Sequence, residues 1–341
     1  MLNSTLQDIF LFSDYCWESS SGRIKNIALK LIEKQRVYLV EPPILGMTSF
    51  AQLNEFYSPD GVIVLTPYLP LKTNESDKNT ITSELLQNFI DQENILYFKS
   101  WYFSSAAWDF SKDLGAKSII MDVEREDQLQ GELAREADYI FAAHPMNDPR
   151  CMEIADGVDF EHFAQARLSL IRPDDLEEIP AGPRIGCYGV YDNTMIEKMA
   201  QLRPELQFIF LQPPGEIELP NVHYLGVKNF YSLPLYISHW DIALTQLQDK
   251  HLLELLSAGK PTICLNKKAV VAENLIFKAE DADELSKKID EALEQNTNDP
   301  HWIDRVDQFL QTKSWEHQVN LMLEVQSLEE LPMEQQVTLT Q

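Results

Sequence analysis

Short apolar runs alternate with amphipathic helical stretches along most of the chain. In the first half the runs at residues 9–12, 37–40 and 61–67 predict strands, as do those at 95–98, 117–123 and 138–145. Apolar positions at helical spacing predict helices over residues 23–33 and near 128–136. This alternation is typical of a doubly wound sheet.

A polar, proline-bearing passage interrupts the pattern at residues 171–183, IRPDDLEEIPAGP, and predicts a linker. The alternation then restarts with RIGCYGV, a helix, LQFIFLQP and the short run VHYLG. The pattern as a whole therefore predicts an α/β protein of two doubly wound domains with a cleft between them.

A strand-helix-strand unit of parallel type follows at residues 242–265. Its helix contains a broad apolar face of leucines, and Gly259 and Pro261 end it before the next strand. Ligands of such sheets lie beyond the carboxyl ends of the strands, facing helix starts. Glu254 lies near the start of this helix, so it is either a solvated residue of the helix surface or a ligand contact.

The composition fits an ordinary large globular protein. The 341 residues are 44% hydrophobic and 24% charged, and they are long enough for two domains. The four cysteines show no metal-ligand spacing, which favours free thiols. No apolar run has the length of a membrane span and the N-terminus lacks a signal-peptide pattern, so we expect a cytoplasmic protein.

The formal charge of −26 excludes nucleic acid and anionic lipid as general partners, because both carry negative charge. The sequence also contains no HExxH, CxxC, P-loop or nucleophile-elbow pattern. The corresponding metalloprotease, zinc, NTPase and serine-hydrolase classes are therefore disfavoured.

Four stretches carry a resemblance to a known family: NVHYLGVKNFYSLPLYISHWDIAL, SAGKP, RIGCYGVYD and DGVDFEHF. They resemble the signatures of bacterial GT-B glycosyltransferases of the glycosyl-transferase family 4-like group, in the cell-envelope and exopolysaccharide branch. The resemblance implies two Rossmann-like, doubly wound domains facing a central cleft. It also implies a nucleotide-sugar donor held mainly by the C-terminal domain and an acceptor facing the N-terminal one.

The domain limits expected on this basis are an acceptor-side domain over residues 1–170, the linker 171–183 and a donor-binding domain over 184–312. A terminal helix over 313–330 should pack back on the N-terminal domain, followed by a tail over 331–341. Trp315, Val319, Met322 and Leu323 have the spacing of one buried stripe on that helix.

The resemblance assigns the donor site. Glu254 corresponds to the residue that accepts hydrogen bonds from the donor ribose, and a carboxylate suits two vicinal hydroxyls. Gly189 would let the backbone approach the phosphates or the sugar, or it is a plain strand-to-loop turn. Asp192, Lys250 and Arg23 complete the expected donor-binding set.

The sequence departs from the family pattern where positive charge is expected. Only TQLQDK separates the strand at 242–244 from the helix of Glu254, so Lys250 lies near, and not on, the position of a family basic residue. YDNTM stands where the family places an arginine after Gly189. Arg23 matches the family, whereas the histidine expected three residues later is Asn26.

Two candidate catalytic residues end strands of the N-terminal half. Asp122 ends KSIIMDV and His144 ends DYIFAAH, so both should point into the cleft. The aspartate would orient or deprotonate an acceptor hydroxyl, and the histidine would bind a phosphate or hydroxyl. A structural role, such as capping a turn, is open for both.

The leading functional prediction is a retaining glycosyltransferase. It would transfer a sugar from a nucleotide-sugar co-substrate to a glycan, lipid-linked or other acceptor in polysaccharide or glycoconjugate biosynthesis, with no obligatory metal or cofactor. The main alternative is a catalytically degenerate GT-B protein that binds an active partner glycosyltransferase or contacts membrane-bound machinery peripherally. A sugar-nucleotide epimerase is a third, weaker alternative.

Overall fold

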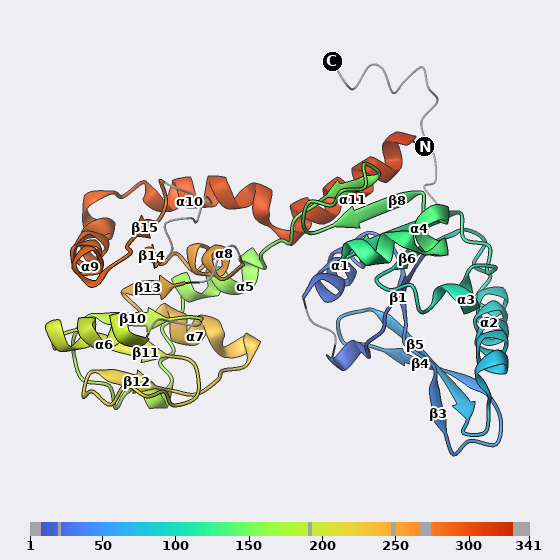
Figure 1. The fold of residues 1–341 in the computed structure, drawn as a ribbon, viewed down its shortest axis with the longest axis horizontal. Helices are drawn as coiled ribbons and strands as arrows, with labels where there is room; N and C mark the ends of the chain where they lie inside the picture. Colours follow the sequence, from blue (N-terminus) through green and yellow to red (C-terminus); the bar gives the residue numbers. More distant parts are fainter. Residues whose placement is uncertain (1–7, 20–21, 190–192, 247–249, 266–273, 330–341) are drawn as a thin grey trace. The chain divides into compact units, whose positions relative to one another are not determined.

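The computed structural model of the protein describes residues 8–19, 22–189, 193–246, 250–265 and 274–329. The chain forms two compact units. Unit 1 comprises Met1–Asp156 with Gln318–Gln341, and unit 2 comprises Gly157–His317. Each unit is built on one sheet of mainly parallel strands (Figure 1).

The sheet of unit 1 has the strand order β3-β5-β2-β1-β6-β7-β8-β9, and β4 pairs antiparallel with β5 while the others are parallel. The strands are β1 Asp8–Phe12, β2 Val37–Val40, β3 Ile44–Gly46, β4 Gln52–Tyr57, β5 Ile63–Pro70, β6 Phe98–Tyr102, β7 Ser118–Val123, β8 Tyr139–Ala142 and β9 Cys151–Glu153. β1 and β2 are buried at every position, as expected for central strands covered on both faces.

The helices of unit 1 follow the strands in chain order. The α-helices are α1 Arg23–Leu31, α2 Glu75–Gln92, α3 Trp108–Ser111 and α4 Glu132–Glu136, and the 3₁₀ turns are η1 Trp17–Ser19 and η2 Glu126–Gln130. The helix predicted near 128–136 is therefore η2 and α4, which meet at Gly131 in an extended conformation. The sequence analysis missed α2, because only four of its eighteen residues are buried.

The terminal helix α11, Trp315–Glu329, belongs to unit 1 from Gln318 onward. Gln326 is buried, accepts a hydrogen bond from Lys99 Nζ at 3.1 Å and accepts one at its backbone carbonyl from the Tyr139 hydroxyl at 3.2 Å. The helix thereby supplies polar partners to β6 and β8, and Figure 1 shows it alongside β8.

The strand predicted at residues 95–98 is displaced in the structure. β6 begins at Phe98 and contains two buried polar residues, Lys99 and Ser100, whereas Leu96 and Tyr97 are exposed. The burial of Lys99 depends on its hydrogen bond to Gln326, far along the chain. Local hydrophobicity placed the start of the strand three residues too early, because that partner is not a neighbour in sequence.

Unit 2 has the strand order β12-β11-β10-β13-β14-β15, all parallel. Its strands are β10 Arg184–Cys187, β11 Gln207–Phe210, β12 Val222–Tyr224, β13 Ile242–Thr245, β14 Thr262–Cys264 and β15 Phe277–Lys278. Its helices are α5 Phe160–Ala164, α6 Asn193–Leu202, α7 Leu233–Ser238, α8 Lys250–Ser257, α9 Ala282–Asn298 and α10 Trp302–Leu310, with 3₁₀ turns η3 Gln165–Arg167, η4 Asp174–Leu176, η5 Phe230–Ser232 and η6 Gln311–Lys313.

The central strand β10 has no room for a side chain at the position of Gly186. Gly186 lies on β10, between β11 and β13, and the place where its Cβ would stand is filled by the indole of Trp240. Trp240 itself is only 2% exposed. The glycine thus allows the large ring to lie directly on the strand.

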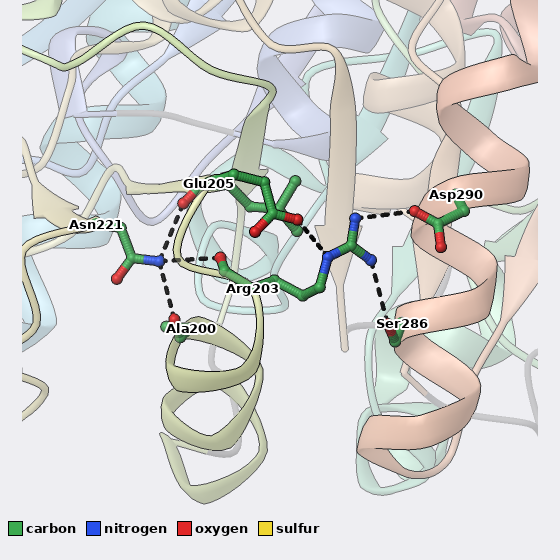
Figure 2. A network of polar contacts seen from close by, with 7 residues as sticks. Ala200, Arg203, Glu205, Asn221, Ser286 and Asp290 are labelled. Atoms are coloured by element: carbon green, nitrogen blue, oxygen red, sulfur yellow. Dashed lines mark hydrogen bonds and ion pairs between the residues drawn. The ribbon is translucent and has the colours of Figure 1, made fainter.

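A polar network joins the end of α6 to α9 and β12 (Figure 2). The amide nitrogen of Asn221 donates to the backbone carbonyls of Ala200 at 3.0 Å and Arg203 at 3.3 Å. The Arg203 guanidinium reaches Ser286 at 3.2 Å and Asp290 at 2.9 Å, both on α9. Asn221 therefore satisfies the Ala200 carbonyl in the last turn of α6 and adds a second donor to the Arg203 carbonyl, which also accepts from Leu206 N at 3.1 Å.

The division between the units differs from the predicted limits. The chain leaves unit 1 after Asp156, ahead of the expected boundary at 170. The segment predicted as a linker contains η4, and its Leu176 and Ile179 are buried in a core cluster with Trp240. These two apolar residues anchor the otherwise polar segment to the core of unit 2.

Among the described residues, none of the helices has the length and apolar character needed to cross a membrane.

Candidate functional site

Four of the predicted site residues, Arg23, Asp122, Gly189 and Glu254, lie near corresponding places in the two sheets. In unit 1 the first strand, β1, lies between β2 and β6, and in unit 2 the first strand, β10, lies between β11 and β13. Chain direction across the sheet reverses at these positions, and the crevice outside the carboxyl ends of the strands there is the usual ligand site of doubly wound sheets.

In unit 1 Arg23 and Asp122 form a buried ion pair. Arg23 opens α1 and Asp122 lies near the carboxyl end of β7, and the guanidinium Nε donates to Asp122 Oδ1 at 2.7 Å. Nη1 of Arg23 also donates to the Ile154 carbonyl and to Asp156 Oδ1, both at 2.9 Å. The topology thus brings together residues that lie about a hundred positions apart.

Asp122 is an unusual carboxyl group. Its side chain is 2% exposed, and burial raises its pKa to about 6, although the neighbouring Arg23 charge lowers it. Within the described part of the chain, Asp122 Oδ2 and Arg23 Nη2 have no hydrogen-bond partner. A carboxyl that titrates near neutral pH and retains an unused oxygen can hold or accept a proton from a ligand hydroxyl.

Arg23 and Asp122 line a cavity of about 580 Å³, a volume typical of small-molecule sites. Its other lining residues follow the carboxyl ends of β1, β6 and β7; they include Ser13, Asp14, Ser104, Ser105, Glu124, Arg125, Asp127 and Gln128. His144 is exposed, lies two residues beyond β8 and is not one of the lining residues. The structure therefore joins Arg23 to Asp122 and leaves His144 apart from both.

In unit 2 Glu254 is the centre of a buried cluster. It is 3% exposed, so its interpretation as a solvated helix residue was wrong. His251 Nδ1 lies 2.8 Å from Glu254 Oε2, and the Tyr188 side chain lies close enough to the same carboxylate for the Glu254 charge to raise the pKa of the phenol. The rings of Tyr188 and His251 meet edge to face with centroids 4.4 Å apart. The cluster joins the carboxyl end of β10 to the first turn of α8.

Tyr188 remains a phenol at physiological pH. Burial raises its pKa well above the ordinary value, and the Glu254 charge raises it further. A neutral phenol keeps its O–H group, so Tyr188 adds no negative charge beside Glu254. Gly189 follows with a φ of 119°, in a region that favours glycine, so the turn after β10 requires this residue.

Two predicted donor residues are not fully covered by the structure. Asp192 lies outside the described residues. Lys250 begins α8, and its side chain also lies outside the described set. Both assignments stay predictions.

The sequence analysis missed Tyr188, His251 and Asp156. The spacing of His251 and Glu254, three residues apart on one helix, places them side by side and was a usable signal. Tyr188 and Asp156 gave none, because their partners are distant in sequence. Across the described residues, no group of three or more His, Cys, Asp or Glu side chains is arranged to hold a metal ion.

The SAGKP stretch has a structural explanation. Lys260 Nζ donates to the carbonyls of Ser238 and Trp240, both at 2.8 Å, at the end of α7. Burial lowers the pKa of Lys260 to about 8. Gly259 has a φ of 69° and ends α8. These residues therefore anchor a helix end.

No protein-family model matches the sequence, and a search of the curated proteins also finds no match. Solved structures do resemble the chain. An alpha,alpha-trehalose-phosphate synthase (UDP-forming) from Burkholderia xenovorans, in complex with glucose-6-phosphate, has a TM-score of 0.60 and 11% identity, covering 94% of this chain and 100% of that one.

Two further structures show the same likeness. The E. coli trehalose-6-phosphate protein bound with UDP-2-fluoro glucose has a TM-score of 0.58 and 11% identity, with 93% and 98% of the two chains covered. A putative UDP-N-acetylglucosamine 2-epimerase from Listeria monocytogenes has a TM-score of 0.53 and 11% identity, with 96% and 98% covered. The chain thus has the GT-B fold, with two Rossmann-like domains, and the fold alone does not select among reactions.

Proposed function

We propose that this protein is a glycosyltransferase that moves a sugar from a nucleotide-sugar donor to an acceptor hydroxyl. The observation that carries the proposal is the buried Glu254 cluster at the ligand-binding edge of the unit 2 sheet, in a chain with the GT-B fold. Solved structures of this fold containing UDP-2-fluoro glucose or glucose-6-phosphate support it.

The finer assignment rests on the sequence resemblance. We propose transfer with retention of configuration, in the cytoplasm, to a glycan, lipid-linked or other acceptor, as in the family 4-like enzymes of polysaccharide biosynthesis. No metal or cofactor is required by this mechanism, because catalysis rests on positioning and on stabilising the leaving diphosphate.

The donor would bind unit 2 through Glu254. A carboxylate offers about four acceptor positions and His251 uses one of them, so positions remain for the ribose hydroxyls. The first turn of α8 would present its backbone N–H groups and dipole to the diphosphate. Gly189 leaves the turn after β10 without a side chain, and Lys250 and Asp192 remain proposed contacts.

The acceptor would bind the cavity of unit 1 beside Asp122. With a pKa of about 6, Asp122 can take up the proton of an acceptor hydroxyl near neutral pH. Arg23 holds this carboxylate in place through its bond to Oδ1. His144 remains a proposed contact for a phosphate or hydroxyl.

The substitution Glu254→Gln is expected to weaken binding of a nucleoside diphosphate by roughly tenfold to a hundredfold. The reason is the loss of charge-assisted hydrogen bonds worth about 1.5–3 kcal/mol. Isothermal titration calorimetry of the folded variant measures the dissociation constant. Glu178→Gln, at an exposed position before β10, is the matched control and should leave the constant unchanged. An unaltered constant for Glu254→Gln would remove this residue from the donor site.

The donor itself can be identified by a thermal-shift screen of nucleoside diphosphates and nucleotide sugars. A ligand that binds only the native state stabilises the protein and so raises its melting temperature. At a ligand concentration of one hundred times the dissociation constant, the stabilisation is about 2.7 kcal/mol. We expect one nucleotide series to stand out. Turnover of the matching nucleotide sugar with a hydroxyl acceptor would then test the transferase directly.

A specific observation favours a second function, that of a non-catalytic partner of an active glycosyltransferase. Glu254 is only 3% exposed and is already paired with His251, and the Arg23 charge is neutralised by Asp122 and Asp156. Both features would also be expected of a GT-B protein that no longer binds a nucleotide-sugar donor. Absence of any nucleotide binding, with tight binding to a partner transferase, would support this function instead.

A further inference from the structure

The charge of the unit 1 cavity is strongly unbalanced. Four carboxylates line it against two guanidinium groups, namely Asp14, Asp122, Glu124 and Asp127 against Arg23 and Arg125. Carboxylates that face a common space repel a further anion.

Neither arginine offers an unshared positive charge. Arg23 is paired with Asp122 and also with Asp156, at 2.7 and 2.9 Å. Arg125 forms two bonds to Asp127, from Nε at 3.0 Å and from Nη2 at 3.3 Å. The one nitrogen of Arg23 without a partner, Nη2, is buried, and a phosphate that reached it would lie beside the carboxylates that already share the Arg23 charge.

The cavity nevertheless offers hydrogen bonds of both kinds. Asp122 Oδ2 is buried and has no partner within the described chain, so it is a ready acceptor. Gln128 uses its oxygen to accept from the backbone N–H groups of Glu124 and Arg125, which leaves its amide nitrogen as a donor. The Ser104 hydroxyl accepts from Ala106 N and can still donate its proton. Hydroxyl groups, which donate and accept, match this lining.

We infer that this cavity takes an uncharged sugar or polyol and discriminates against phosphorylated and carboxylated sugars. The inference rests on the proposed function, since the cavity is then the acceptor site, and it names the acceptor class. It also separates this chain from the structural neighbour that holds glucose-6-phosphate.

The size of the discrimination follows from electrostatics. Two like charges 4 Å apart cost about a factor of five in affinity even at the dielectric constant of water, and more where water is partly excluded. A sugar phosphate carries about two negative charges near neutral pH and would meet more than one carboxylate. We therefore expect a difference of at least about tenfold between a neutral sugar and its phosphate.

The test uses matched ligands on the full-length protein. Glucose, galactose and mannose are each compared with their own 6-phosphate by saturation-transfer NMR titration, at low ionic strength and at about 0.15 M salt. At least one neutral sugar should bind, and its phosphate should bind at least about tenfold more weakly at low salt. The difference should narrow as salt screens the carboxylates.

The double variant Glu124→Gln with Asp127→Asn places the effect in the cavity. Both side chains are exposed, so the fold should survive, and the change removes two carboxylates and releases Arg125. The ratio between the dissociation constants of the sugar phosphate and the neutral sugar should fall by about tenfold in this variant. Glu84→Gln with Asp60→Asn removes the same charge at exposed positions that do not line the cavity, and should leave the difference intact.

Three results would overturn the inference: equal or tighter binding of the phosphates, a difference that the cavity variant leaves unchanged, or no binding of any neutral sugar. Failure of the proposed function is a separate result. If a nucleotide binds and Glu254→Gln weakens it, but sugar phosphates are preferred, only the acceptor class is wrong. If neutral sugars are preferred and no nucleotide sugar binds or reacts, only the transferase assignment fails.

Discussion

Replacing Gly186 by alanine is expected to destabilise unit 2 by about 3–5 kcal/mol, the largest stability effect we expect from a single methyl group in this protein. The added Cβ would lie 1.8 Å from Trp240 Cδ2 and 2.0 Å from Cε3, far inside any observed contact. β10 cannot move away because it is hydrogen bonded to β11 and β13. The indole is itself buried, since Trp240 is only 2% exposed, so moving it would disturb the packing around it.

Denaturant unfolding followed by amide hydrogen exchange measures this loss and assigns it to unit 2. Gly46→Ala is the control, since a Cβ there meets nothing within 4 Å, and its midpoint should be close to that of the parent. In a Trp240→Leu background the cost of Gly186→Ala should fall, because the two positions share one space. A stable Gly186→Ala protein would show that the close packing of Trp240 on β10 is incorrect.

Replacing Arg23 by methionine is expected to cost about 3–5 kcal/mol at pH 8 and roughly 1 kcal/mol at pH 5. At pH 8 the variant would bury an ionised Asp122 with no countercharge, which is the costly way to break a buried pair. At pH 5 the aspartic acid can bind a proton and avoid that cost. The effect of the substitution should therefore depend on pH.

The direction follows from proton linkage. The pKa of Asp122 in the folded parent is about 6, above the value of 3.8 for an unperturbed aspartate, so the folded state binds the proton more tightly than the unfolded state. This contribution to stability is complete below about pH 4 and is lost as pH rises through about 6. Without Arg23 the folded pKa should rise further, so stability should decline more steeply between pH 5 and 8.

Urea unfolding at the two pH values measures the difference. The double variant Arg23→Met with Asp122→Asn carries no charge at the site and should regain stability at pH 8 relative to Arg23→Met. It should also show a pH dependence no steeper than that of the parent. An equal loss for Arg23→Met at pH 5 and pH 8 would mean that its cost is packing and not an unpaired carboxylate.

The sequence determined most of the architecture because a buried parallel strand is visible as a short run of apolar residues. Every residue of β1 and β2 is buried. Gly259 and Pro261 mark the end of α8 in the sequence, because Gly259 adopts a positive φ there and a proline cannot continue a helix. The α/β class, two doubly wound sheets and the positions of Asp122 and Glu254 at strand and helix ends could therefore be predicted. The GT-B fold, expected from the family resemblance, is confirmed by its structural neighbours.

Only the tertiary structure decided which side chains meet. Lys99 is buried in a strand because Gln326 accepts its hydrogen bond, and the buried Glu254 has His251 as a partner. Burial raises the pKa of Asp122 to about 6, and the Arg23 charge beside it opposes that rise. A local pattern records how apolar a segment is, but not which distant charge or hydrogen-bond donor offsets the burial of a polar group. Those partners are set by strand order, and the chemistry of both candidate sites depends on them.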